Sequence, residues 1–354
     1  MNKKTPKLLD CTLRDGGYYN AWDFSVDLIN DYLESMSAIS VDYVELGFRS
    51  LEANSFKGSC AYTTDNFIRQ LNLPSNLQLG VMINASEIVN HKQGLVYALS
   101  QLFKPSIKSP LTLVRIACHM HEFESALPAC FWLKEMGYEV GVNLMQIAER
   151  SKDEIEKVAY LASQYPIDVL YFADSMGSMS PDHTSDIIST LRLGWEGPLG
   201  IHTHDNMGRA MANSLRAVSN GVTWIDSTVT GMGRGPGNVQ TEYLAIEMAE
   251  FKNIPLNLAP LLAVIDKHFK PLQSKYCWGM NPYYYLSGKY CIHPSFIQEM
   301  LSDSRYDDED LFTVIENLRE IGGKKFSIKT LESGRNFYKG EPSGSWSPYS
   351  LIHE

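Results

Sequence analysis

Two histidines separated by a single residue offer the clearest chemistry in this 354-residue sequence. His202 and His204 lie in a short apolar segment, after Gly200 and Ile201, that is typical of a β-strand. Side chains alternate between the two faces of a strand, so both imidazoles point to one side and Thr203 points to the other. Such a pair can bind one divalent metal ion, although exposed or hydrogen-bonded histidines at a strand end would show the same spacing.

The elements that would position these histidines recur along the chain. Eight apolar, β-rich segments alternate with amphipathic segments, which predicts a parallel sheet with helices outside it. Eight repeats in about 250 residues predict an α/β fold of the (β/α)8 TIM-barrel type. The predicted strands span residues 7–12, 43–49, 77–84, 111–119, 139–146, 169–175, 199–205 and 224–230, and the predicted helices 26–39, 122–136, 152–164, 182–193, 207–220 and 239–251. An open, doubly wound sheet is the alternative, but the first strand lacks the Gly-x-Gly-x-x-Gly sequence of dinucleotide-binding versions.

The pattern changes from about residue 253 onward. We expect residues 1–252 to form the metal-dependent barrel domain and residues 253–354 to form a helical C-terminal appendage. Its predicted helices span residues 256–269, 295–301, 308–321 and 327–331, and the Pro-, Ser- and Gly-rich segment 340–354 is predicted to be a loose tail. An aromatic segment at 278–285 is predicted to pack the appendage on the barrel.

Composition restricts the class of protein. A net charge of −10 argues against nucleic-acid binding, which requires a basic surface. No apolar run reaches 18 residues, so no membrane span is expected. Six scattered cysteines without a Cys-x-x-Cys pair, and an N-terminus without a signal peptide's apolar segment, predict reduced thiols in a cytoplasmic protein.

Polar residues at the carboxyl ends of the strands would converge, because all eight ends meet around one mouth in a TIM barrel. Asp15 follows the first strand and, with His202 and His204, would form a ligand set that leaves positions open for water and substrate. Such a set suits Mn²⁺, our first expectation, and also Zn²⁺, Co²⁺, Fe²⁺ or Mg²⁺. Arg14 beside Asp15 is well placed to stabilise an enolate oxygen. The polar residues predicted to bind substrate are Glu45, Arg115, Asn143, Asp174, Ser175 and Thr230.

A glycine-rich loop follows the last strand. Glycines alternate at 231, 233, 235 and 237, which is similar to a phosphate-binding nest. The loop lacks the Gly-Lys-[Ser/Thr] ending of a P-loop. A lid or a tight turn over the barrel mouth is the alternative.

Three separated motifs resemble those of the DRE-type TIM-barrel metallolyases, which include 3-hydroxy-3-methylglutaryl-CoA lyase, isopropylmalate and homocitrate synthases and 4-hydroxy-2-oxovalerate aldolase. They are Asp-Cys-Thr-Leu-Arg-Asp-Gly at 10–16, His-Thr-His-Asp-Asn at 202–206 and Gly-Arg-Gly-Pro-Gly-Asn-Val-Gln-Thr-Glu at 233–242, and the likeness covers residues 7–250. The resemblance implies that Asp15, His202 and His204 bind a divalent metal. It further implies that Asn238 is a fourth ligand, that Arg14 stabilises an enolate, and that Glu45 lies near the metal.

The aldolase branch of this superfamily is the most similar. The glycine loop lacks the cysteine of the CoA-thioester lyase, and residues 14–18 differ from the Arg-Asp-Gly-Glu-Gln of the synthases. Val-Arg-Ile-Ala-Cys-His at 114–119 and the short appendage resemble the aldolases. Those enzymes carry a catalytic histidine where this chain has Tyr18. We expect Tyr18, Tyr19 or His119 to replace it as the acid or base.

The function predicted from these residues and this resemblance is that of a divalent-metal-dependent aldolase, a carbon–carbon lyase. It would cleave or form a 4-hydroxy-2-oxoacid, or a sugar-like analogue, through a metal-bound pyruvate enolate. The expected small molecules are pyruvate and an aldehyde, and the resemblance implies a homo-oligomer that can work with an aldehyde-processing enzyme. The alternatives are a Claisen-type synthase that condenses an acyl-CoA with a 2-oxoacid, and a non-catalytic barrel partner in a larger assembly.

Overall fold

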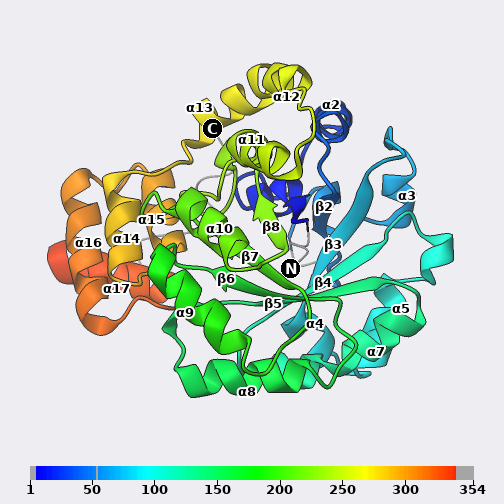
Figure 1. Cartoon of the computed structure of the whole chain (residues 1–354). Coiled ribbons are helices and arrows are strands. Elements are labelled where there is room, and N and C mark those ends of the chain that lie inside the picture. Colours follow the sequence, from blue (N-terminus) through cyan, green and yellow to red (C-terminus); the bar gives the residue numbers. More distant parts are fainter. Residues whose placement is uncertain (1–4, 53–54, 340–354) are drawn as a thin grey trace.

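The computed structural model describes residues 5–52 and 55–339, and its centre is a closed barrel of eight parallel strands in sequence order (Figure 1). The strands are β1 (Lys7–Asp10), β2 (Tyr43–Phe48), β3 (Gln78–Asn84), β4 (Leu113–Cys118), β5 (Glu139–Leu144), β6 (Val169–Asp174), β7 (Leu199–Thr203) and β8 (Trp224–Ser227). The barrel closes because β1 pairs with both β2 and β8. The TIM-barrel prediction is therefore confirmed, and the open-sheet alternative is wrong.

The barrel interior changes from apolar to charged toward the carboxyl ends of the strands. The apolar layer contains Tyr43, Leu113, Val169 and Trp224, each the first residue of its strand, and the same apolar cluster includes Leu9, Cys11 and Tyr171 further along the chain. Two residues further along β2, β4 and β8 come Glu45, Arg115 and Asp226, which point inward because side-chain direction repeats every two residues. All three are buried. A charged layer therefore lies between the apolar layer and the mouth.

Helices surround the barrel, and the structure has them at α1 (Thr12–Asp15), α2 (Val26–Ala38), α3 (Asp65–Ile68), α4 (Ala85–Val89), α5 (Leu95–Leu102), α6 (Phe123–Ala126), α7 (Pro128–Glu135), α8 (Lys152–Ala162), α9 (Pro181–Leu191), α10 (Ala210–Ser219) and α11 (Thr241–Lys252). Short 3-10 helices lie at η1 (Gly16–Tyr18), η2 (Ser59–Ala61), η3 (Ser106–Lys108), η4 (Ile147–Glu149) and η5 (Val229–Gly231). The single helix predicted over 122–136 is two helices, α6 and α7. The second begins at Pro128, whose ring nitrogen has no hydrogen to continue the hydrogen-bond ladder.

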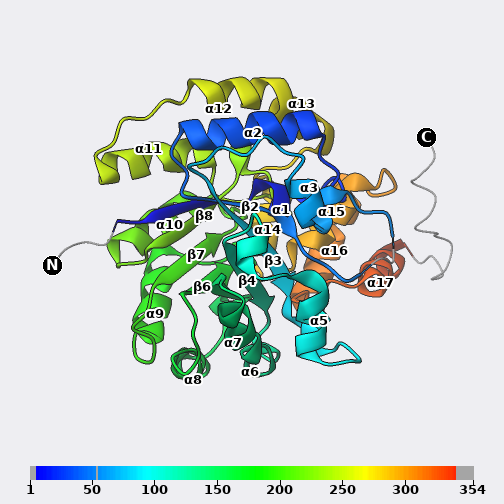
Figure 2. The ribbon, with the colours of Figure 1, turned by 90° about the vertical axis from the view of Figure 1, so that its right-hand side faces the viewer.

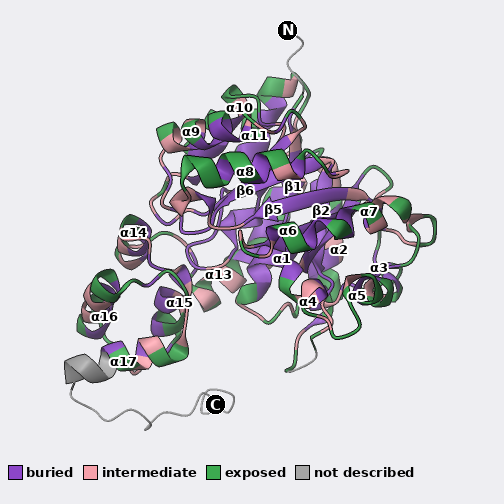
Figure 3. Ribbon diagram, turned by 90° about the horizontal axis from the view of Figure 1, so that it is seen from below, coloured by how far each residue is buried: buried purple, intermediate pink, exposed green. Residues whose placement is uncertain are grey.

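Residues beyond α11 form two groups. The first is a continuous run of α12 (Ala259–Val264), the π-helix η6 (Ile265–Phe269) and α13 (Lys270–Tyr276), which lies along α2 (Figure 2). Its buried residues, and Trp278 after it, belong to the core that the barrel helices share. The second group is α14 (Pro282–Lys289), α15 (Pro294–Ser302), α16 (Asp308–Ile321) and α17 (Ile328–Lys339), which has a core of its own (Figure 3).

The appendage is helical, as the sequence predicted, with two additions. The first is α13, which follows the predicted helix 256–269. The aromatic segment contains a helix, α14, which starts at Pro282 and is capped by the Asn281 side chain. The boundary at residue 252 stays a prediction, and the change from the barrel core to the appendage core comes between Trp278 and Tyr284. The predicted loose tail, 340–354, lies outside the described residues.

Two expectations about the class of protein can be compared with the structure. All six cysteines are free, and four of them are buried, as the scattered cysteines predicted. Within the described part of the chain, no helix combines the length and the apolar composition needed to cross a lipid bilayer.

Candidate metal centre and active site

The turn after β1 carries the first functional residues. Asp10, at the end of β1, accepts hydrogen bonds from the side chains of Thr12, Tyr32 and Thr241, which hold this turn against α2 and α11. The chain then forms α1, whose last two residues, Arg14 and Asp15, are buried at the barrel mouth. The fold thereby brings Asp15 to the end of β7, more than 180 residues later in the sequence.

Asp15, His202 and His204 form one cluster of possible metal ligands. The Oδ2 atom of Asp15 lies 3.4 Å from Nε2 of His202 and 4.0 Å from Nε2 of His204. One ligand atom from each residue falls within 4.8 Å of the others, and all three residues are buried. The structure therefore brings together the three ligands that the sequence predicted.

Two unpaired oxygen atoms in this cluster indicate whether a metal ion would fit there. Asp15 Oδ2 and Asn238 Oδ1 are buried and have no hydrogen-bond partner among the described residues. Asn238 donates through Nδ2 to the carbonyl oxygen of Thr203 at 3.0 Å, which leaves Oδ1 free. A Cβ atom added to Gly233 would lie 1.9 Å from Asn238 Oδ1 and 2.9 Å from Asp15 Oδ2. Two unpaired oxygens thus face one small space beside two imidazoles, and this donor set fits a divalent cation.

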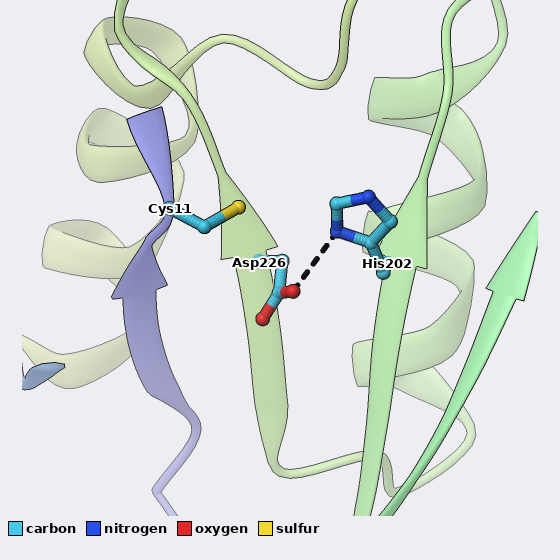
Figure 4. Close-up of side chains that lie close together, drawn as sticks. All are labelled: Cys11, His202 and Asp226. Atoms are coloured by element: carbon cyan, nitrogen blue, oxygen red, sulfur yellow. Dashed lines mark hydrogen bonds and ion pairs between the residues drawn. The ribbon is translucent and has the colours of Figure 1, made fainter. Parts of the chain in front are cut away.

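The carboxylate of Asp226, which was not predicted from the sequence, orients the ring of His202. Its Nδ1 lies 2.9 Å from Oδ2 of Asp226, so Nε2 is left to face Asp15 (Figure 4). Cys11 lies close to the same pair, burial raises the pKa of its thiol well above the usual value, and its Sγ donates to the Ser227 carbonyl oxygen at 3.5 Å. Asp226 occupies an inward position on β8 two residues after Trp224, and this spacing was the available signal.

Arg14 is held by two carboxylates. It donates through Nε to Glu45 at 2.8 Å and through NH1 to Asp15 at 2.8 Å, whereas NH2 is buried and has no partner among the described residues. Glu45 also accepts from Nε of Arg115 at 2.7 Å. Burial alone would raise the pKa of Asp15, but the Arg14 guanidinium holds that pKa well below its usual value. The Asp15 carboxylate is therefore charged over the physiological range.

One cavity of about 260 Å³ opens over this cluster. Its lining includes eight of the predicted site residues: Arg14, Asp15, Tyr18, His119, Asn143, Ser175, His202 and His204. Apolar residues from β2 to β6 also line it, namely Phe48, Met82, Ala117, Met145 and Ala173. The carboxyl ends of the strands thus meet around one space, as the barrel prediction required.

Four residues predicted to bind substrate lie behind the cavity wall. Glu45 and Arg115 bind each other, and Arg115 also donates to Asp226. The oxygens of Asp174 accept from the backbone nitrogens that follow β6, and burial raises its pKa to about 7. The Thr230 hydroxyl donates to the Val229 carbonyl oxygen. The structure does not bring these four side chains into the cavity, because each is taken up by partners inside the fold.

Among the lining residues that were not predicted from the sequence, two come from the glycine-rich loop and the appendage. Arg234, from the glycine-rich loop, donates to Nε2 of His293 at 2.8 Å and to the carbonyl oxygen of Ser175 at 3.1 Å. His293 precedes α15, and burial lowers its pKa to about 3, so its ring is neutral and can accept from Arg234. Arg234 belongs to the Gly-Arg-Gly-Pro-Gly-Asn motif and could have been predicted from it. His293 reaches the cavity from the appendage, and no local sequence pattern marks it.

The glycine-rich loop forms a tight turn over the cluster of possible metal ligands. The backbone of Gly237 passes so close to Gly231 that an added Cβ would lie 1.7 Å from the Gly231 carbonyl oxygen. The Asp205 amide donates to the Gly237 carbonyl oxygen at 2.9 Å, and the Gly235 amide donates to Gln298 of α15 at 2.9 Å. The loop is thus held between β7 and the appendage, which favours the lid or tight-turn alternative over a phosphate nest.

The sequence of this chain is similar to those of known proteins. Residues 5–264 match the sequence model of the HMGL-like family. The chain belongs to the HMGL-like family. Relatives of this HMGL-like chain include 4-hydroxy-2-oxovalerate aldolase 2 of Rhodococcus opacus, 29% identical over 277 residues and 77% of each chain, and the 4-hydroxy-2-oxovalerate aldolase of Carboxydothermus hydrogenoformans, 25% identical over 335 residues, 92% of this chain and 96% of that one. The oxaloacetate decarboxylase of Mycobacterium tuberculosis is 27% identical over 244 residues, 68% of this chain and 69% of that one.

Solved structures agree with the fold of this HMGL-like chain. The N-terminal domain of a protein described as an aldolase from Bacteroides vulgatus is 30% identical, with a TM-score of 0.76 over 84% of this chain and 97% of that one. The carboxyl transferase domain of Rhizobium etli pyruvate carboxylase, solved with pyruvate, has a TM-score of 0.69 at 16% identity over 96% of this chain and 61% of that one, a likeness of fold alone. The predicted family, and the prediction of an enzyme of the lyase class, are confirmed.

Proposed function

We propose that this chain is a divalent-metal-dependent aldolase that cleaves or forms a 4-hydroxy-2-oxoacid, with pyruvate as the 2-oxoacid product. The names of its relatives support this activity. The observation that carries the proposal is the unpaired, buried NH2 group of Arg14 beside the metal-ligand cluster. A hydrogen-bond donor that is shielded from water and has no partner can stabilise an oxygen that becomes negative during the reaction.

The metal would be held by Asp15, His202, His204 and Asn238, and we expect Mn²⁺ first, with Mg²⁺, Co²⁺ or Zn²⁺ as alternatives. When bound, such an ion supplies a Lewis acid for the carbonyl and carboxylate oxygens of a 2-oxoacid. Asp15 is suited to this because the adjacent Arg14 keeps it charged. Asp226 is suited to hold His202 with Nε2 directed at the site.

Arg14 stabilises the enolate in the carbon–carbon step. A base removes the proton of the 4-hydroxyl, the C4 carbonyl forms, and the electrons of the C3–C4 bond become the C2–C3 double bond of the enolate. The C2 oxygen gains negative charge in this step. NH2 of Arg14 donates to that oxygen while Nε and NH1 stay bound to Glu45 and Asp15. The guanidinium needs no reorganisation, which is the condition for a large electrostatic effect.

Two cavity residues can move the protons. Burial lowers the pKa of His119, so its imidazole is neutral at pH 7 and can accept the proton of the 4-hydroxyl. Tyr18 lines the same cavity, and its phenol is protonated at neutral pH and can donate toward C3 of the enolate. We propose His119 as the base and Tyr18, which stands where the resemblance led us to expect a histidine, as the proton donor.

The test is pyruvate-dependent aldol chemistry in the purified protein. We expect condensation of pyruvate with an aldehyde to stop in EDTA and to return when Mn²⁺ is added. Full activity of metal-free protein would contradict the proposal. Release of free thiol from acetyl-CoA with a 2-oxoacid would instead identify a Claisen-type synthase. Decarboxylation of oxaloacetate without aldol activity would assign the chain the reaction named in one relative.

Assembly is a separate part of the proposal. The homo-oligomer and the aldehyde-processing partner that the resemblance implies stay predictions. Light scattering of the purified chain, and its elution with a candidate aldehyde dehydrogenase, are the measurements that test them.

A further inference from the structure

The cavity has two chemically different sides. The metal-ligand residues come from the ends of β1 and β7 and the loop after β8, which are neighbours in the closed barrel. The ends of β3, β4 and β5 lie across the barrel from them, as the ring of strands in Figure 1 requires. If the 2-oxoacid occupies the metal side, the remaining part of the substrate faces β3 to β5.

Asn143 on β5 is the most unusual residue on that second side. It is only 3% exposed, it lines the cavity, and its Oδ1 has no hydrogen-bond partner among the described residues. A buried amide oxygen without a hydrogen-bond partner destabilises the fold unless a ligand supplies the missing donor. Ionised pyruvate carries only acceptor oxygens and cannot satisfy Oδ1, whereas a hydroxyl group can donate to it.

A second amide lies in the same row. Strand register places Asn84 of β3 beside Ala117 of β4, and Ala117 beside Asn143 of β5. Asn84 also lines the cavity, and its Nδ2 group donates to Glu87 at 2.9 Å. The small Ala117 side chain between the two amides leaves room for a ligand. Two amide side chains therefore flank one opening in the cavity wall.

Polar groups surround this opening and apolar groups lie beneath it. Met82 comes two residues before Asn84 on the inward face of β3, and it packs with Phe48, Ala117 and Met145. Farther out, the cavity is lined by Ser86, His119, Glu122, Gln146 and Ser175. An apolar floor with a polar rim matches a short carbon chain that carries hydroxyl groups along one side.

We propose that the β3–β5 side of the cavity is a subsite for a hydroxylated aldehyde, so that the acceptor is a neutral hydroxyaldehyde of two or three carbons. This inference rests on the proposed aldolase function and names its second substrate. An alkyl aldehyde of equal length would leave the Asn143 oxygen unpaired. The Glu122 carboxylate at the rim disfavours a phosphorylated aldehyde, because like charges repel, and the lining cation Arg234 is held by His293 and the Ser175 carbonyl oxygen.

The first test compares acceptors in the condensation with pyruvate. A site built to pair a hydroxyl rejects an analogue that lacks it, so we expect kcat/KM for glycolaldehyde and glyceraldehyde to exceed that for acetaldehyde and propanal by roughly 100-fold. Equal values, or a preference for the alkyl aldehydes, would overturn the inference. A preference for glyceraldehyde 3-phosphate over glyceraldehyde would overturn the assignment of a neutral acceptor.

Variants locate the preference within the cavity. We expect Asn143→Leu to lower kcat/KM for glyceraldehyde by about 10-fold to 100-fold and to change that for propanal by less than about 3-fold. Asn84→Ala is the second variant if Asn143→Leu fails to fold, and it should shift the same ratio. The matched control is Asn90→Ala, because Asn90 is exposed at the end of α4. An equal fall in kcat/KM for glyceraldehyde and for propanal would contradict a role in acceptor recognition.

A measurement without any aldehyde separates this inference from the proposed function. Pyruvate in D2O should exchange its methyl protons on the Mn²⁺-loaded enzyme, since enolisation needs no acceptor. Exchange without a preference for hydroxyaldehydes overturns the subsite and leaves the aldolase proposal in place. Absence of exchange together with absence of condensation overturns the proposed function itself.

Discussion

His202 and Asp226 are joined by a hydrogen bond of 2.9 Å between Nδ1 and Oδ2, across the neighbouring strands β7 and β8. His202 lines the cavity, whereas Asp226 lies behind it, outside the lining. The contact assigns the two nitrogens of one imidazole different tasks, since Nδ1 binds the carboxylate and Nε2 faces Asp15 at 3.4 Å. A carboxylate behind a histidine in this way orients the ring and makes it a better metal ligand.

Loss of the Asp226 charge should therefore weaken metal binding. We expect Asp226→Asn to reduce Mn²⁺ affinity by about 10-fold to 100-fold, measured by calorimetric titration of the metal-free protein. Asp153→Asn is the control, because Asp153 lies in the exposed first turn of α8. Unchanged affinity in a folded Asp226→Asn protein would show that the orientation of His202 does not depend on this contact.

Gly233 should tolerate no side chain. A Cβ atom there would meet Asn238 Oδ1 and Asp15 Oδ2, the two oxygens proposed to bind the metal. We expect Gly233→Ala to reduce Mn²⁺ affinity more than about 10-fold, since misplacing ligands removes binding contacts. Gly334→Ala in α17 is a control distant from the cavity. Tight Mn²⁺ binding by Gly233→Ala would contradict the proposed ligand pair.

Arg14→Ala should separate chemistry from metal binding. Removal of one donor to a developing oxyanion typically costs about 10²- to 10³-fold in kcat, and we expect a loss of that size here. Glu45 keeps its bonds to Arg115 in this variant, whereas Asp15 loses its contact with Arg14, so turnover is compared at a Mn²⁺ concentration that saturates the variant. The measurements are steady-state kinetics beside a metal titration and a thermal melt. Turnover near the wild-type value would refute the role in enolate stabilisation.

The pH profile should report on His119. Burial lowers its pKa below the usual 6.5, and only the neutral ring accepts a proton. Activity should therefore be complete well above that pKa and should be lost as the pH falls through it, at a point below 6.5. His119→Gln should lower kcat by about 10²- to 10⁴-fold and abolish this limb. His121→Gln should keep it, because the His121 side chain is 78% exposed.

The barrel was predictable because its signals are local. Apolar runs and helical periodicity follow from which face of each segment is buried, and all eight strands were located from them. Local signals also explain two of the differences, whereas the short helices α3, α4 and α5 of the second and third crossovers were not predicted. Pro128 divides a predicted helix, and the Asn281-Pro282 pair starts α14 within a segment that aromatic content alone had marked as packing.

The sequence by itself predicted the cluster of candidate metal ligands. Asp15, His202 and His204 stand at strand ends, and a parallel barrel brings all such ends to one mouth. Only the tertiary structure decided which other side chains lie beside these three residues and their cavity. Asp226 reaches His202, and Asn84 reaches the row of Asn143, through strand register, which sequence patterns do not encode. His293 enters the cavity because the appendage packs on the glycine-rich loop, a contact between distant segments whose energy depends on shape rather than on spacing along the chain.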